Sequence, residues 1–234
     1  MQLNQQIPTK SVATESGAML LIHSLFYTIQ GEGPYAGMPA VFLRLAGCNL
    51  QCPGCDTEYT AGARKMGVGD ICEAIECAWP NMLRSPLVVI TGGEPFRQNL
   101  TFLARTFVAM GWQVQIETNG TLPPSDGLPK CVTIVCSPKT GAINKKLAIR
   151  IDAYKYVARA EDISPLDGLP RIALGHRNGG RLARPHGYGK PIYLQPMDEQ
   201  DDELNAANTK AVVESCMRHG HRLCLQMHKI VGVE

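Results

Sequence analysis

The chain has 234 residues, 44% of them hydrophobic, which is enough to bury one substantial core. Its formal net charge of +2 sets up no strong field of either sign, so the composition favours small-molecule chemistry over a nucleic-acid or membrane surface. The nine cysteines are an odd number and follow no secretory signal or membrane-length apolar run, so we expect reduced thiols and a cytoplasmic protein rather than a disulfide framework.

The chain begins with a segment that lacks any period. We expect residues 1–18 to form a flexible N-terminal extension, followed by a single domain over residues 19–234. Partial alternation over residues 20–30 predicts a strand, and the apolar run at residues 40–47 predicts another. The glycine-rich turn between them is interrupted by prolines and opens no helix, so we reject a dinucleotide-binding motif there.

Three cysteines lie on the loop directly after the second predicted strand. Cys48, Cys52 and Cys55 have the spacing Cys-x3-Cys-x2-Cys on one short loop. Three thiolates can hold three irons of a four-iron cluster, which normally takes four cysteines, so one iron would remain open. An open position at a metal centre usually receives a substrate or cosubstrate. The alternative is a zinc or iron-sulfur binding module without enzymatic activity.

Strands and helices alternate along the rest of the chain. In order, we expect a helix capped by Asp70, a strand at 87–91, a helix at 98–110, strands at 112–118, 131–136 and 152–157, a basic loop at 167–190, a strand at 191–195, a helix over 204–220 and a closing strand at 222–226. This alternation predicts an α/β fold with a parallel sheet. About six repeats cannot close an eight-unit barrel, so we expect an open, partial (β/α)6-type barrel.

Unusual motifs follow the predicted strands. They are the cysteine loop, Gly92-Gly93-Glu94, Asn119-Gly120, Ser137-Pro138-Lys139 and Gln195-Pro196. The carboxyl ends of parallel strands lie along one rim, so these motifs should converge on one site. Glycines let the backbone approach a ligand closely, and Glu94 can accept a hydrogen bond from an amino group. Taken by itself, Gly-Gly-Glu-Pro is equally the sequence of an ordinary turn.

The cysteine spacing is the signature of the radical S-adenosylmethionine superfamily. Within it, the chain resembles the 7-carboxy-7-deazaguanine synthase family of queuosine biosynthesis. The resemblance rests on motifs in order over nearly the whole chain: Gln30-Gly31-Glu32-Gly33, Cys55-Asp56-Thr57, Thr91-Gly92-Gly93-Glu94-Pro95, Glu117-Thr118-Asn119-Gly120, Ser137-Pro138-Lys139, Leu194-Gln195-Pro196 and Gln226-Met227-His228-Lys229. Two positions depart from the usual family pattern: Gly54 stands where many members have an aromatic residue, and Met227 where threonine is more usual.

The resemblance implies a lyase. Its substrate would be the pterin 6-carboxy-5,6,7,8-tetrahydropterin, which becomes 7-carboxy-7-deazaguanine by radical ring contraction with loss of ammonia. The implied cofactors are a [4Fe-4S] cluster, S-adenosyl-L-methionine and Mg²⁺. The cysteines would hold the cluster, and its reduction in the presence of S-adenosylmethionine would release a 5′-deoxyadenosyl radical.

The resemblance also assigns roles to residues. Thr57 would ligate Mg²⁺, a hard ion that prefers oxygen, although without the resemblance loop capping is the simpler interpretation. Arg44 would clamp the substrate carboxylate, with a structural ion pair as the alternative. The expected pterin contacts are Ile29, Gln30, Gly31, Glu32, Arg44, Thr91 and His228. The expected cosubstrate contacts are Gly54, Cys55, Asp56, Gly93, Glu94, Ser137, Pro138, Lys139 and Gln195.

The expected partners follow from the same resemblance. We expect a homodimer that accepts electrons from a flavodoxin-like or other low-potential donor, and no nucleic-acid or membrane partner. The basic loop at 167–190 could meet an acidic donor, but a solvated face is the plainer interpretation. A radical enzyme that activates a glycyl-radical partner shares the cysteine spacing, yet it would not call for Thr57 and His228 together with the Gln30–Gly33 motif.

Overall fold

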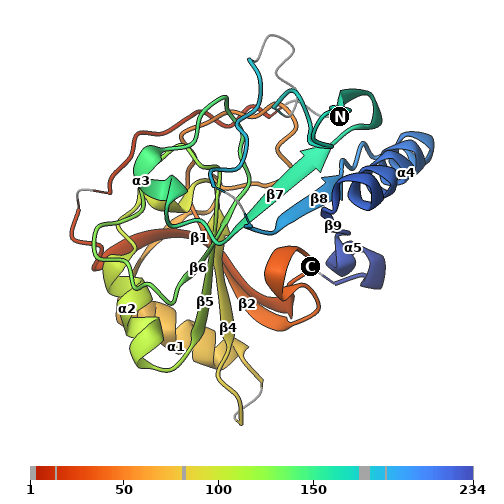
Figure 1. The fold of residues 1–234 in the computed structure, drawn as a ribbon. Coiled ribbons are helices and arrows are strands. Elements are labelled where there is room, and N and C mark those ends of the chain that lie inside the picture. Colours follow the sequence, from red (N-terminus) through yellow and green to blue (C-terminus); the bar gives the residue numbers. More distant parts are fainter. Residues whose placement is uncertain (1–3, 14, 81–82, 174–179, 188, 234) are drawn as a thin grey trace.

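One sheet organises the residues that the computed structural model describes, which are 4–13, 15–80, 83–173, 180–187 and 189–233. These residues form nine strands in the order β3-β1-β2-β4-β5-β6-β7-β8-β9 (Figure 1). The strands are β1 (Met19–Ile29), β2 (Pro39–Leu45), β3 (Arg64–Gly67), β4 (Leu87–Gly92), β5 (Gln113–Thr118), β6 (Thr133–Cys136), β7 (Ala153–Ala158), β8 (Ile192–Pro196) and β9 (Arg222–Leu223).

The sheet is mostly parallel. From β2 through β4 to β9, neighbouring strands run in the same direction, as the alternation of strands and helices predicted. The first strand is the exception, because β1 pairs antiparallel with both β2 and β3. The short turn between β1 and β2 leaves no room for the crossover that a parallel pair needs. Since β3 and β9 lie at opposite edges, the sheet stays open, and the predicted partial barrel is confirmed.

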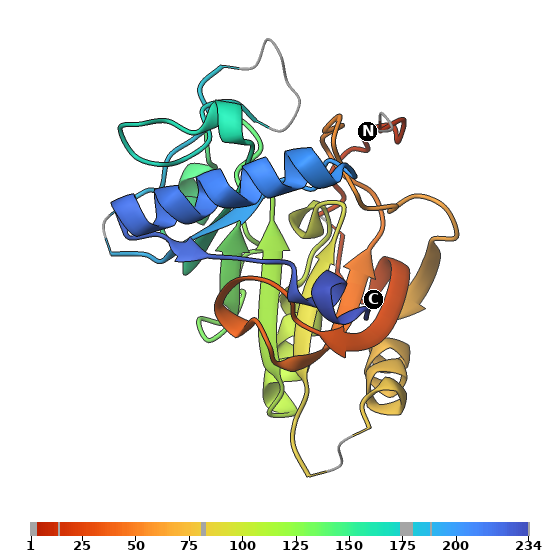
Figure 2. The same cartoon turned by 90° about the vertical axis from the view of Figure 1, so that its right-hand side faces the viewer.

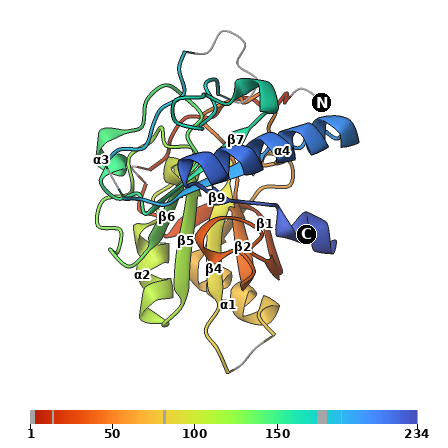
Figure 3. The ribbon, with the colours of Figure 1, turned by 45° about the vertical axis from the view of Figure 1, so that its right-hand side comes forward.

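The longer helices cover the outer face of the sheet, whereas the short last helix, Met227–Val231, lies at the cavity that the strand ends surround. The helices are α1 (Val68–Ala78), α2 (Thr101–Ala109), α3 (Lys145–Ala148), α4 (Asp202–His219) and α5 (Met227–Val231), with the 3₁₀ turns η1 (Gly33–Tyr35), η2 (Pro95–Arg97) and η3 (Ala160–Asp162). Helix α1 contacts β1 and α2, helix α2 contacts β5, and α4 lies across β8 (Figure 3). None of the described helices combines the length and apolar character that crossing a bilayer requires.

The main core lies between these helices and the sheet. Ile71 and Ile75 of α1 and Leu103 and Phe107 of α2 are fully buried, and they share one cluster with the strand residues beneath them. The apolar stripes that predicted these helices are therefore their packed faces. In β4 the four residues from Leu87 to Ile90 are all buried, as expected of a central strand covered on both sides.

Several elements differ from the sequence prediction at their ends, and the clearest differences concern an expected helix cap and two strands. Helix α1 begins at Val68, so Asp70 lies inside the first turn, where its Oδ2 accepts a hydrogen bond from the Gly67 N–H at 3.2 Å. Strand β3 was missed because its four residues carry no apolar alternation. The predicted closing strand at 222–226 is shorter, since β9 ends at Leu223 and the chain then turns into α5.

The N-terminal segment runs beside the cysteine loop, as Figure 2 shows. The Asn4 N–H donates to the Pro53 carbonyl at 3.2 Å, and the Thr9 N–H donates to the Cys48 carbonyl at 2.7 Å. The Gln6 side chain donates to the Thr57 carbonyl at 2.8 Å. The predicted flexibility of residues 1–18 stays a prediction, and residues 1–3 and 14 lie outside the described part of the chain. The described part of the segment nevertheless pairs with the loop that carries the three cysteines.

Candidate active site

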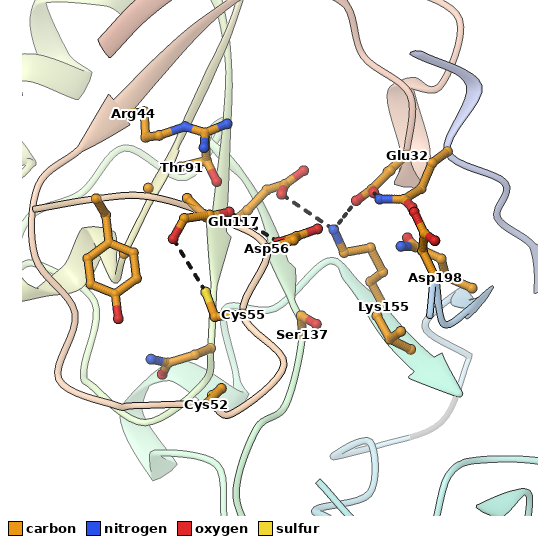
Figure 4. Close-up of a pocket in the computed structure, with 18 of the residues that line it drawn as sticks. Glu32, Arg44, Cys52, Cys55, Asp56, Thr91, Glu117, Ser137, Lys155 and Asp198 are labelled. Carbon is orange, nitrogen blue, oxygen red and sulfur yellow. Dashed lines mark hydrogen bonds and ion pairs between the residues drawn. The ribbon is translucent and has the colours of Figure 1, made fainter. Parts of the chain in front are cut away.

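The carboxyl ends of the parallel strands surround a cavity of about 530 Å³. The cysteine loop forms one wall, with Cys52 and Cys55 labelled in Figure 4, and strand ends from β2 to β8 contribute the floor. His228 of α5 also lines the cavity. Almost every residue that the sequence assigned to the site lines this cavity. Gly31, Glu94 and Pro138 are the exceptions among the assigned residues. The expectation that the motifs converge at one rim is therefore met.

All three cysteines line the same wall of the cavity, although the described side chains do not form a ready-made group of three metal ligands there. Cys48 is buried, and its sulfur accepts the Leu50 N–H at 3.4 Å and the side-chain N–H of Asn119 at 3.9 Å. Burial raises the pKa of the Cys48 thiol to about 11 and also raises the pKa of Cys52 and of Cys55. The raised pKa values favour protonated thiols in the metal-free protein. A bound metal reverses this, because a coordinating thiol loses its proton. Three sulfurs on one wall, with N–H donors behind the first, fit an iron-sulfur cluster.

The Gly92–Gly93 turn packs directly on the start of the cysteine loop. The Gly93 N–H donates to the Leu45 carbonyl at 3.2 Å, and the Glu94 N–H donates to the Gly47 carbonyl at 3.0 Å. A Cβ atom added to Gly93 would overlap the Gly47 carbonyl and lie 2.8 Å from the Cys48 nitrogen. Glycine is thus required at 93 for this close approach, which fixes where Cys48 begins the loop.

Glu94 lies behind the cavity wall and is fully buried. Its carboxylate accepts hydrogen bonds from the Phe96 N–H at 3.0 Å, the Thr118 hydroxyl at 2.8 Å and the Asn119 N–H at 2.7 Å. Burial is the main cause that raises the pKa of Glu94 to about 7. A direct contact with the cosubstrate would require the carboxylate to leave these donors. In the structure it instead holds Asn119 against the Cys48 sulfur.

Arg44 and Thr91 lie side by side at the ends of β2 and β4, where they are register partners. The Arg44 guanidinium lies 5.5 Å above the centre of the Phe26 ring. Its Nε is buried without a hydrogen-bond partner among the described residues, and no carboxylate of that part of the chain pairs with it. The structural ion pair considered as the alternative for Arg44 is thus not formed there. Arg44 lines the cavity as a cation without a carboxylate partner among the described residues.

A buried network of charged and amide side chains forms the opposite wall. In Figure 4 the Lys155 ammonium of β7 lies between the carboxylates of Glu32 and Glu117. Its distance to the Glu117 Oε2 is 3.5 Å, and its contact with Glu32 is closer. Gln30 donates to the Glu117 Oε1 at 3.0 Å, and Gln226 donates to the Glu32 Oε1 at 2.9 Å. The network leaves polar groups along the cavity at fixed positions.

Burial and charge act in opposite directions in this network. Burial alone would raise the pKa of Glu32, but Lys155 and then Gln226 outweigh it and lower that pKa to about 2. Burial would lower the pKa of Lys155, yet Glu117 and Glu32 hold that pKa well above its usual range. Glu32 is therefore a carboxylate and Lys155 an ammonium at neutral pH. Burial lowers the pKa of His228, which favours a neutral ring facing Glu32.

Gly31 supports His228 from behind the cavity. A Cβ atom at Gly31 would overlap the Nδ1 atom of the His228 ring, and the Gly31 carbonyl accepts the Met227 N–H at 3.3 Å. The Gly31 position is therefore where α5 docks on the end of β1. A side chain at 31 would push the imidazole out of the site.

We expect Gly31→Ala to raise the KM for the substrate of this site by at least tenfold, because the displaced His228 ring can no longer face the cavity. His228→Ala alone should weaken activity, but Gly31→Ala/His228→Ala should lose little more, since the overlap disappears with the ring. Steady-state kinetics of the three variants provides the measurement. Additive losses in the double variant would contradict the contact.

Two further predicted groups lie at the end of β6. The Lys139 ammonium donates to the Ser137 hydroxyl at 2.7 Å, and both side chains line the cavity. Burial and then the charge of Lys155 lower the pKa of Lys139, whereas Cys52 and Asp56 raise it. Gln195 of β8 is 5% exposed and completes this side. Pro138, between Ser137 and Lys139, is buried and does not line the cavity.

Thr57 and Asp56 place two oxygens at the edge of the cysteine loop. The Thr57 hydroxyl donates to the Asp56 Oδ1 at 3.2 Å, and both residues line the cavity. The Thr57 backbone carbonyl is held by Gln6, as described above. Oxygen atoms of this kind suit a hard cation.

The sequence analysis assigned no role to several residues that the structure brings into the site. They are Gln115, Glu117, Asn119, Lys155 and Gln226. A signal existed for Lys155, because it interrupts the predicted buried strand at 152–157 between Tyr154 and Tyr156. A lysine inside a buried strand implies a buried anionic partner.

Comparison with known proteins identifies the family. No protein-family model matches the chain. The chain is 41% identical to the 7-carboxy-7-deazaguanine synthase of Rhodospirillum rubrum, with 97% of each chain covered. It is 38% identical to the enzyme of the same name from Rickettsia prowazekii, covering 97% of this chain and 94% of that protein. Its fold is similar to that of QueE from Escherichia coli, with a TM-score of 0.68 and 25% identity over 89% of this chain and 94% of that one. The chain belongs to the 7-carboxy-7-deazaguanine synthase family.

Proposed function

We propose that the chain is a radical S-adenosylmethionine lyase that converts 6-carboxy-5,6,7,8-tetrahydropterin to 7-carboxy-7-deazaguanine, with loss of ammonia. The observation that carries this proposal is one cavity lined by three cysteines, by an arginine without an ion-pair partner among the described residues, and by a network of charged and amide side chains. The relatives of the same name support the assignment and do not favour a glycyl-radical activating enzyme or a purely structural metal module.

The cysteine wall is the place for the cofactors. Cys48, Cys52 and Cys55 would hold the 4Fe-4S cluster, which, when reduced with S-adenosylmethionine bound, supplies a 5′-deoxyadenosyl radical. Gly54 would allow close approach of the cosubstrate because it has no side chain, and Gly93 would contact it with the backbone that lines the cavity. Asp56, Ser137, Lys139 and Gln195 present polar groups on the neighbouring wall and would orient it.

The opposite side is the place for the pterin. Arg44 would bind the substrate carboxylate through its guanidinium, which lines the cavity and forms no ion pair within the described part of the chain. Ile29, Gln30, Glu32, Thr91 and His228 line the rest of that side. The ionised Glu32 suits the amino and N–H groups of the pterin ring, which are hydrogen-bond donors. Substrate orientation would thus come from one forked cation and one fixed anion.

We expect Arg44→Lys to raise the KM for the pterin by about tenfold to a hundredfold, because an ammonium cannot replace two parallel hydrogen bonds to a carboxylate. The KM for S-adenosylmethionine should change by less than threefold. Arg105→Lys, on the exposed surface of α2, provides the control. Equal effects on the two KM values would contradict the assigned role.

We propose Thr57 as the ligand of Mg²⁺. Thr57→Val keeps the shape of the side chain but removes its oxygen, so activity should lose its response to added Mg²⁺. Thr57→Ser keeps the oxygen and should keep the response. Titration of activity with MgCl₂ for the three proteins is the measurement. A valine variant with the parent's Mg²⁺ dependence would show that the hydroxyl only caps the loop.

The remaining proposals concern the surroundings of the enzyme. Residues 19–234 would act as one domain and as half of a homodimer, in the cytoplasm, with a flavodoxin-like or other low-potential electron donor. All nine cysteines are free thiols in the structure, which suits a reducing compartment. In the basic loop, Arg184 pairs with Asp167 at 2.7 Å and Arg171 pairs with Asp162 at 3.5 Å. Part of the positive charge of the loop is therefore neutralised by ion pairs within the chain. Residues 174–179 and 188 of this loop lie outside the described part of the chain.

Turnover under anaerobic conditions tests the proposed function. The reconstituted protein is incubated with dithionite, S-adenosylmethionine and 6-carboxy-5,6,7,8-tetrahydropterin, and the products are identified by mass spectrometry. We expect 7-carboxy-7-deazaguanine and ammonia, with S-adenosylmethionine regenerated. A colourless zinc protein without product would instead support the metal-binding module. A coloured protein that cleaves S-adenosylmethionine but leaves the pterin intact would support the glycyl-radical activating enzyme.

A further inference from the structure

Arg97 is a buried cation directly behind the first cysteine of the cluster-binding loop. It ends the η2 turn and is 4% exposed. Its Nη2 donates to the Ala46 carbonyl at 3.3 Å. A Cβ atom added to Gly47 would overlap this Nη2 and lie 3.0 Å from the Cζ atom. The guanidinium therefore lies flat against the two residues that precede Cys48.

The N-terminal segment covers Arg97 from the other side. The Arg97 Nη1 donates to the Lys10 carbonyl, and the Arg97 carbonyl accepts from the Val12 N–H at 2.7 Å and from the Ser11 hydroxyl at 3.1 Å. The Thr9 hydroxyl donates to the Cys48 carbonyl at 3.2 Å. Residues 9–12 thus separate the guanidinium from solvent, which lowers the local dielectric constant and strengthens its field.

The guanidinium lacks a full countercharge. Within the described part of the chain, no carboxylate lies at ion-pair distance from it, and its Nε has no hydrogen-bond partner. Its two acceptors are neutral carbonyls, which do not compensate for removing a unit charge from water. Burial lowers the pKa of Arg97, whereas Cys48 and then Glu94 raise it. Glu94 therefore offsets part of the charge of Arg97 without forming an ion pair with it, and Cys48 is the other group on which negative charge can compensate the guanidinium.

A cluster on the three cysteines would supply the missing negative charge. Three thiolates give an oxidised 4Fe-4S cluster a net charge of about −1, and one-electron reduction adds another negative charge. A fixed cation nearby stabilises the reduced state more than the oxidised state, so it raises the reduction potential. This effect is strongest where the cation is buried, as Arg97 is.

We propose that Arg97 is the buried countercharge of the cluster: through its place behind Cys48 it favours the reduced state, and residues 9–12 keep it shielded from solvent. The proposal rests on the proposed function, because it requires a cluster on the three cysteines. In this role Arg97 is a positioning residue that acts through the cluster rather than on the substrate.

The midpoint potential of the cluster tests the proposal. It is measured on reconstituted protein by a mediator titration, followed through the electron paramagnetic resonance signal of the reduced cluster. At a fixed solution potential, Arg97→Met should lower the ratio of reduced to oxidised cluster by about tenfold, which is a shift of about 59 mV to more negative values. Arg97→Lys keeps the charge and should stay close to the parent. Arg105→Met removes the same charge from an exposed position and should leave the potential unchanged.

The outcomes separate this proposal from its alternatives. An unchanged potential in Arg97→Met would overturn it, and so would equal shifts in the lysine and methionine variants, which would indicate a purely structural role. If Arg97→Met folds but takes up no cluster while Arg97→Lys takes up a full cluster, the proposal is also overturned. The positive charge would then be needed to assemble the cluster rather than to set its reduction potential. Should Arg97→Met not fold by circular dichroism, Arg97→Gln carries the same expected shift. A parent protein without a cluster would refute the proposed function instead.

Discussion

Lys155→Met is expected to lower the free energy of unfolding by about 3–5 kcal/mol at neutral pH and to reduce turnover at least a hundredfold. The substitution leaves the Glu32 and Glu117 carboxylates in one buried site without the cation that lies between them. One carboxylate must then take up a proton or move out of the cavity. Urea unfolding of the cluster-free protein measures the loss of stability. Lys146→Met, which removes an exposed lysine, should change it by less than about 0.5 kcal/mol.

The loss of folding stability caused by Lys155→Met should depend on pH. In the parent chain the folded-state pKa of Glu32 is about 2, below its usual 4.5, so its contribution is present above pH 4.5 and is lost as the pH falls toward 2. Without Lys155, burial dominates and raises that pKa above its usual value. The difference in stability between parent and Lys155→Met should therefore be largest above about pH 5 and shrink below it. Adding Glu117→Gln to Lys155→Met should recover part of the stability, and a double variant weaker than the single one would contradict the network.

Gly93→Ala is expected to remove most of the bound iron and at least 99% of the activity. The added methyl group would overlap the Gly47 carbonyl and press on the Cys48 nitrogen, and both are backbone atoms that cannot rotate away. The first cysteine would then move relative to the other two. Iron and sulfide per chain after anaerobic reconstitution, together with the melting temperature of the cluster-free protein, provide the measurements.

A second glycine gives a matched control for Gly93→Ala. Gly69 lies in the first turn of α1, and a Cβ atom there meets nothing within 4 Å. Gly69→Ala should keep full iron content and gain about 0.5–1 kcal/mol of stability, because alanine is the better helix former. A Gly93→Ala variant that binds iron as well as Gly69→Ala does would show that the close approach is not needed for the cluster.

The sequence was sufficient for the parts of the site that depend on chain order. The cysteine loop, Gly93 and Ser137 each follow a predicted parallel strand, and parallel strands bring their carboxyl ends to one rim. The open sheet could be predicted for the same reason, from the number of strand and helix repeats. The antiparallel β1 could not, because the direction of a strand depends on the short turn that follows it rather than on its own pattern.

The parts that were missed depend on contacts between distant segments. Lys155, Glu32 and Glu117 lie on three different segments of the chain. No local sequence pattern indicates that these three side chains contact one another. Glu94 was expected on the cavity surface, but Thr118 and the Asn119 backbone draw its carboxylate behind the wall. The N-terminal segment has no apolar period, since its bonds to the cysteine loop come largely from the backbone and from short polar side chains such as Gln6.

The central claim is that three sulfurs hold a cluster with one iron open to S-adenosylmethionine. The most direct measurement is electron paramagnetic resonance of the anaerobically reconstituted and reduced protein, recorded before and after S-adenosylmethionine is added. We predict the signal of a reduced 4Fe-4S cluster whose g values shift on addition, and its loss in Cys52→Ala. A signal that the cosubstrate leaves unchanged, or a protein that contains zinc and no iron, would contradict the account.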